Sequence, residues 1–102
     1  MPLPPRDHRI ALAEAASHTR RHREAQVSAV TAETFHADQV RQLLAQPGCA
    51  ALRIYYGRGE QGAPTLVLVG ADAAGADLTG GDLLEWPLPC PPYCASPNAL
   101  TD

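Results

Sequence analysis

Length, composition and charge set the first limits on this chain. It has 102 residues, of which 45% are hydrophobic and 19% charged, a composition typical of a folded domain and not of a disordered segment. The net charge of −3 argues against a nucleic-acid partner, and no apolar run approaches the roughly 18 residues that a membrane span needs. The amino terminus has no hydrophobic signal-peptide segment, so the cytoplasm is the default expectation.

The first half of the chain predicts two helices after an extended, proline-rich lead, residues 1–8. Residues 9–26 contain strong helix formers without proline or glycine, and Asp7 can cap this helix. A second helix is expected over residues 37–46, with an apolar stripe formed by Val40, Leu43 and Leu44.

The second half changes to the alternating pattern of strands. One strand is expected at residues 51–56, with Leu52, Ile54 and Tyr56 on one face, and a second at residues 65–69. A shorter third strand is expected within residues 76–86. We therefore predict an α+β domain over residues 9–86, in which the two N-terminal helices pack on a small antiparallel three-stranded meander.

Residues 87–102 form a C-terminal tail that is rich in proline and carries a cysteine pair. Five prolines between Pro87 and Pro97 exclude a helix and a central strand, because proline lacks the backbone donor and fixes φ. The tail is expected to be extended or a chain of turns.

The pair Cys90 and Cys94 has three possible roles. In polyproline geometry the two cysteines would stand about 12 Å apart, whereas a disulfide needs Cα atoms within roughly 7 Å, so pairing requires a turn through the intervening residues. The spacing does not match a thioredoxin-like redox motif. A metal site needs about four ligands; Cys49, Cys90 and Cys94 offer three, and a histidine could complete them. A structural disulfide or inert thiols are therefore favoured over metal binding and over reactive thiols. A native disulfide would place the protein outside the cytoplasm.

Self-association is the leading expectation for function. The second strand is apolar on both faces, so one face needs a cover beyond the two helices, and a small sheet leaves two open edges. The tail is shaped for docking on a neighbour. The candidate interaction residues are Leu66, Val67, Leu68, Val69, Trp86, Pro91, Pro92 and Tyr93.

The sequence also resembles a group of small uncharacterised bacterial proteins of about this length. The matching segments include Gln46-Pro-Gly-Cys49, Arg53-Ile-Tyr-Tyr-Gly57 and, most distinctively, Pro89-Cys-Pro-Pro-Tyr-Cys94. This resemblance implies no activity, cofactor or catalytic residue.

We therefore expect a non-enzymatic structural or interaction protein without a cofactor, whose partner is a second copy of itself in an oligomer or filament. The alternative is a small thiol or metal-binding protein that uses Cys49, Cys90 and Cys94.

Overall fold

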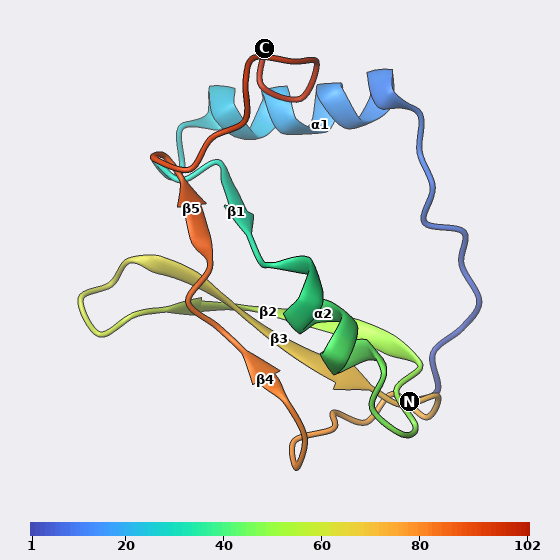
Figure 1. The fold of residues 1–102 in the computed structure, drawn as a ribbon. Coiled ribbons are helices and arrows are strands. Elements are labelled where there is room, and N and C mark those ends of the chain that lie inside the picture. Colours follow the sequence, from blue (N-terminus) through green and yellow to red (C-terminus); the bar gives the residue numbers. More distant parts are fainter. The chain divides into compact units, whose positions relative to one another are not determined.

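The computed structural model describes residues 1–102, which form two helices and five strands (Figure 1). They fall into two compact units, each built from segments distant in sequence. Unit 1 comprises Met1–Pro5 and Phe35–Pro87, and unit 2 comprises Arg6–Thr34 and Leu88–Asp102. Both sheets are antiparallel, so the predicted α+β class is confirmed. Neither helix combines the length and the apolar character needed to cross a membrane.

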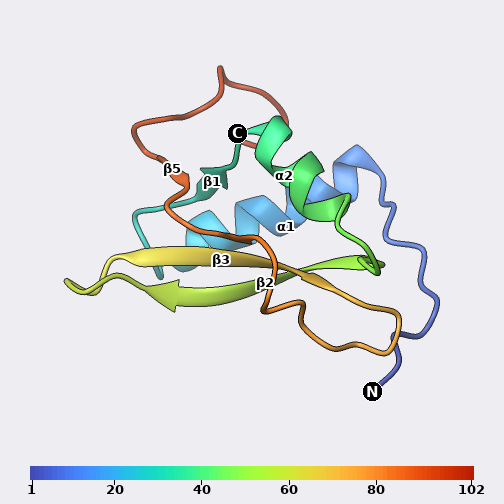
Figure 2. The same cartoon turned by 60° about the horizontal axis from the view of Figure 1, so that its bottom comes forward.

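Unit 1 contains a three-stranded sheet in the order β2-β3-β4, as the predicted meander requires. Its strands are β2 (Ala51–Arg58), β3 (Pro64–Ala71) and β4 (Leu83–Leu84). Figure 2 shows β2 and β3 side by side as a long hairpin, in which Leu52 lies opposite Gly70 and Tyr56 opposite Leu66. Both strands extend two residues beyond their expected carboxyl ends.

Helix α2 (Ala37–Leu44) packs on β3 and supplies the most buried side chain of unit 1. Leu43 is fully buried, and in β3 the successive residues Leu68 and Val69 are both buried. Because successive strand residues point to opposite faces, both faces of β3 are covered at this point. Gly48 just beyond the helix has a φ of 81°, a left-handed conformation that glycine adopts without steric cost.

Unit 2 contains α1 (Leu12–Ala25) and a two-stranded sheet formed by β1 (Ala32–Thr34) and β5 (Leu88–Cys90). The sequence analysis did not predict β1, because three residues are too few to show an alternating pattern. Strand β5 tolerates Pro89 because each strand of a two-stranded sheet has a free edge.

Helix α1 begins three residues later than expected. Asp7 does not cap it; its carboxylate accepts hydrogen bonds from the backbone and side chain of Arg9. The N-cap position is taken by Ala11, which has no side chain able to make a cap hydrogen bond.

Candidate functional site

The outer edge of β2 is the first candidate site. This strand pairs with β3 on one side only, and its eight residues make it the longer of the two edge strands of the sheet. An edge strand presents unpaired N–H and C=O groups that can pair with another chain.

The hydrogen bonds around β3 identify which β2 residues point their backbone groups outward. The carbonyl of Gly70 accepts from the N–H of Leu78, on the side of β3 away from β2, at 2.8 Å. Gly70 lies opposite Leu52, and opposed residues of an antiparallel pair bond either to each other or both away. At the hairpin loop, the N–H of the odd-numbered Gly59 donates to the carbonyl of Ala63. The odd-numbered residues of β2 therefore bond toward β3, and the even-numbered ones point away from it. Leu52 and every second residue after it therefore point outward.

Three of these outward-pointing residues carry exposed apolar side chains, and the fourth is the charged Arg58 at the end of β2, which donates to the carbonyl of Gly62. Leu52, Ile54 and Tyr56 are 36%, 48% and 93% exposed, and all three lie on the same face because strand side chains alternate. We call these three residues the β2 edge. Apolar side chains and unpaired backbone groups thus occur together along one strand.

The opposite face of β2 carries a polar cluster made by Arg53, Tyr55 and Asp77. The Arg53 guanidinium and the Tyr55 hydroxyl each donate to the Asp77 carboxylate at 2.5 Å, and Arg53 also donates to the carbonyl of Gly75 at 2.9 Å. The bonds from Tyr55 and Arg53 lower the pKa of Asp77, and the bond to Asp77 raises the pKa of Tyr55. The cluster neutralises the charge of Arg53 next to the β2 edge.

The predicted interaction residues lie in different environments. In β3, Leu66 and Val67 are half-buried, whereas Leu68 and Val69 are buried and offer no surface. Trp86 is 88% exposed and has a φ of 63°, which is unusual for a bulky residue. Pro91, Pro92 and Tyr93 are also exposed. The exposed aromatic residues thus remain candidates for contact.

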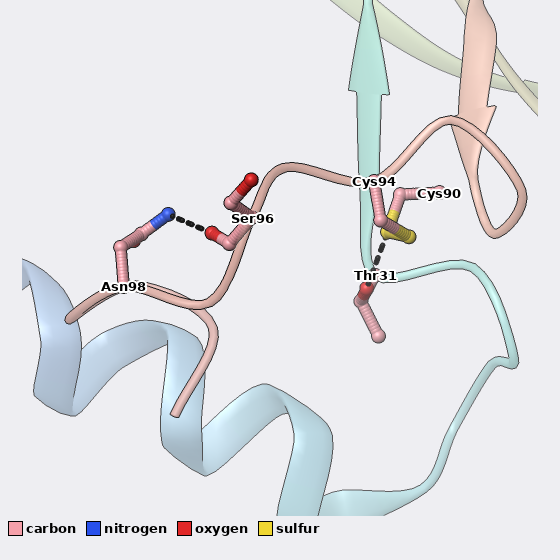
Figure 3. Close-up of a disulfide and its surroundings, with 5 residues drawn as sticks. All are labelled: Thr31, Cys90, Cys94, Ser96 and Asn98. Atoms are coloured by element: carbon pink, nitrogen blue, oxygen red, sulfur yellow. Dashed lines mark hydrogen bonds between the residues drawn. A yellow bond between two sulfur atoms is a disulfide. The ribbon is translucent and has the colours of Figure 1, made fainter.

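The second candidate site is the disulfide between Cys90 and Cys94 in unit 2, whose Cα atoms lie 4.7 Å apart. The turn between them is closed by a hydrogen bond of 2.9 Å from the N–H of Tyr93 to the carbonyl of Pro89. Two of the peptide bonds between the cysteines, Cys90–Pro91 and Pro91–Pro92, are cis. Figure 3 shows the Thr31 hydroxyl directed at the sulfur of Cys90, at 3.8 Å.

Beyond the disulfide the tail is tied to α1 by Arg23, whose guanidinium donates to the backbone carbonyl oxygens of Leu100 and Asp102. A hollow of about 650 Å³ lies in unit 2 and is lined by residues of α1, β1 and the tail. Arg23, the one cation that lines it, is already bonded to the tail, so it does not offer a free charge to a ligand.

Cys49 carries a free, half-buried thiol, which donates a hydrogen bond to the carbonyl of Ala51. Nowhere does the chain bring together three or more histidine, cysteine or acidic side chains in a group that could hold a metal ion. The disulfide also leaves Cys90 and Cys94 without thiolates to offer as ligands.

Comparisons with protein-family models, with curated proteins and with solved structures found no match to this chain.

Sequence reasoning named strand edges as contact surfaces but did not name the residues of the β2 edge. The alternation of Leu52, Ile54 and Tyr56 was visible, yet alternation alone does not say which face is covered. The polar cluster was also missed, because Asp77 is distant in sequence from its two partners in β2.

Proposed function

We propose that the protein is a non-enzymatic interaction protein that self-associates into an oligomer or filament through the edge of its three-stranded sheet. The observation that carries this proposal is the β2 edge, where unpaired backbone groups and exposed apolar side chains belong to the same three residues. Natural edge strands are commonly shortened, charged or covered to prevent such pairing. Strand β2 is long, and its charged Arg53 is bound within the polar cluster.

The tail offers a second contact in this proposal. Two copies that pair through the same edge form a closed dimer, because the contact uses up the edge of both. Growth into a filament requires a different surface, and exposed aromatic and proline residues suit it. The candidates are Pro91, Pro92 and Tyr93 within the tail, and separately Trp86, which precedes it.

The test is the mass of the purified full chain in solution, measured by sedimentation velocity over a wide concentration range. We expect association that increases with concentration, and Ile54→Lys should abolish it, because a lysine on an edge strand opposes pairing. Val27→Lys is the matched control, since Val27 is an exposed apolar residue outside any strand. A monomer at the highest concentration would contradict the proposal.

Electron microscopy then separates a dimer from a filament. If Trp86 or the tail residue Tyr93 supplies the second contact, a variant with Trp86→Ala and Tyr93→Ala should stop at the dimer. Filaments that persist in this variant would exclude these two residues as the second contact.

A further inference from the structure

We propose that two copies of the chain pair through β2, antiparallel and across a two-fold axis perpendicular to the sheet, with Ile54 opposite the partner's Ile54. This inference rests on the proposed function, because it names the contact through which association takes place. The two three-stranded sheets would then form one continuous sheet, in which β2 is no longer an edge strand.

The backbone alternation restricts the possible registers. Residues that oppose each other across a new antiparallel pair must both point their N–H and C=O groups toward the partner. The outward-pointing residues are the even-numbered ones, so an even residue must lie opposite an even residue of the partner. Registers centred on Arg53, Ile54 or Tyr55 satisfy this condition. Sliding one strand by a single residue along the other, from any of these registers, places even residues opposite odd ones and does not satisfy it.

The length of overlap excludes the first of these registers. A pair centred on Arg53 joins only residues 51–55 of β2, because the partners of residues 56–58 would lie before the strand begins, and Tyr56 is left without a strand partner. Centring on Ile54 moves Arg53 opposite the partner's Tyr55, where a cation can contact an aromatic ring.

The apolar side chains select between the two remaining registers. With Ile54 at the centre, Leu52 lies opposite the partner's Tyr56, so every pair formed by the β2 edge is apolar. With Tyr55 at the centre, Leu52 would lie opposite the partner's Arg58. Aromatic and aliphatic cross-strand pairs are the favourable ones, so the Ile54 register matches better.

The same features identify a second copy of this chain as the occupant of the edge. The strand is complementary to itself in backbone alternation, in apolar pairing and in charge. Arg53 and Asp77 are paired within each copy at 2.5 Å, so joining two copies brings no unneutralised charge to this face of the contact. A foreign strand would have to reproduce all three properties.

Single cysteines test the register. In a Cys49→Ser background, we compare Ile54→Cys with Tyr55→Cys after oxidation by diamide, which accepts the electrons of the two thiols. In the proposed register the cysteines at position 54 are about 5.5 Å apart between Cα atoms. Those at position 55 lie diagonally, about 7–8 Å apart, which is at or beyond the reach of a disulfide. We expect cross-linking to be about tenfold faster at position 54 than at position 55.

The opposite order of rates would overturn this register in favour of the one centred on Tyr55. Equal, slow cross-linking at both positions in a protein that still associates would overturn pairing through β2 and leave only self-association standing, through a surface other than the β2 edge. Failure of the unsubstituted chain to associate would remove both.

Amide hydrogen exchange of the unsubstituted protein gives an independent test. The amides of Leu52, Ile54 and Tyr56 should exchange about tenfold more slowly at concentrations where the protein associates, because pairing occupies them. The amides of Arg53 and Tyr55 already bond to β3 and should not change with concentration. Association without slower exchange at the three edge amides would overturn the inference. Protection that is independent of concentration would also overturn it, because it indicates a contact within one chain.

Discussion

Unit 1 buries some large apolar side chains in a core, whereas unit 2 leaves nearly all of its side chains exposed or half-exposed. Leu43, Leu68 and Val69 are buried in unit 1, while the only buried residues of unit 2 are Ala16 and Cys90. Hydrophobic stabilisation scales with the apolar area removed from water, at about 25 cal/mol per Å². Unit 2 therefore depends more on its disulfide, its short β1–β5 pairing and the bonds of Arg23 to the tail.

The difference separates two tasks within a small chain. The core of unit 1 holds the hairpin of β2 and β3, whose outer strand presents the β2 edge. Unit 2 has little core, and small folds with little core commonly use disulfides as a substitute.

The core of unit 1 should be most sensitive at Leu43. Replacement of this fully buried residue by alanine removes apolar contacts and leaves a cavity, which should lower the free energy of unfolding by about 2–5 kcal/mol. Leu44→Ala on the same helix is the matched control, because Leu44 is 42% exposed and should lose less than about 1 kcal/mol. Urea unfolding followed by circular dichroism measures both. Equal losses at the two positions would mean that unit 1 has no tightly packed core around Leu43.

Gly70 tests how closely that core is packed. A Cβ at this position would lie 2.9 Å from the sulfur of Cys49 and 3.3 Å from a methyl carbon of Leu78. Gly70→Ala should therefore destabilise the protein by about 1–3 kcal/mol, the usual cost of overpacking. Gly57→Ala is the control in β2, because its nearest contact would be an ordinary 3.4 Å.

The sulfur of Cys49 is the group that a methyl at position 70 would meet first. Adding Cys49→Ala to Gly70→Ala should therefore restore part of the lost stability. If the stability losses of the two single variants simply add in the double variant, the space at Gly70 is not limited by Cys49.

The disulfide should matter for unit 2 and little for unit 1. Closing a loop of about five residues limits the entropy of the unfolded chain, and its loss should cost about 2 kcal/mol. In a variant with Cys90→Ser and Cys94→Ser, we expect faster amide exchange in β1 and β5 and unchanged exchange in β2 and β3. A reducing agent added to the unsubstituted protein should have the same effect, since Cys49 is not bonded. Equal loss of protection in both units would remove the contrast between them.

Sequence reasoning recovered unit 1 better than unit 2 for a physical reason. The strands of unit 1 are long enough for their alternation to be visible, and Pro47-Gly48 marks the end of α2. Strand β1 has three residues and is paired with a segment more than fifty residues away, so no local sequence pattern predicts it. The spacing of Cys90 and Cys94 is compatible with a disulfide but does not predict one, because the disulfide depends on a turn that the spacing alone does not determine.

The β2 edge shows a second limit. Ile54 and Tyr56 follow the same alternation as buried strand residues, and only the placement of α2 and β4 decides which alternating side chains are covered. Tertiary packing of this kind cannot be read from the residues of one strand.

The smallest expected effect is the pH dependence that the polar cluster adds to unit 1. Bonds from Tyr55 and Arg53 lower the pKa of Asp77 in the folded protein below its unfolded value of about 4. The charged carboxylate therefore stabilises the fold above about pH 4, and this contribution is lost as the pH falls through the lowered folded pKa.

Asp77→Asn removes this titration while keeping the size of the side chain, so it isolates the contribution of the charge. Between about pH 5 and pH 2, the free energy of unfolding of the unsubstituted protein should fall more steeply than that of the variant. Tyr55→Phe deletes only the hydroxyl that donates to Asp77, the largest of the causes that lower its pKa, and should give an intermediate slope. Parallel pH curves for all three proteins would show that the cluster contributes no pH-dependent stability.

Since the cluster neutralises Arg53 beside the β2 edge, Asp77→Asn should also weaken association at neutral pH, by leaving one unpaired cation on each copy at this face of the contact.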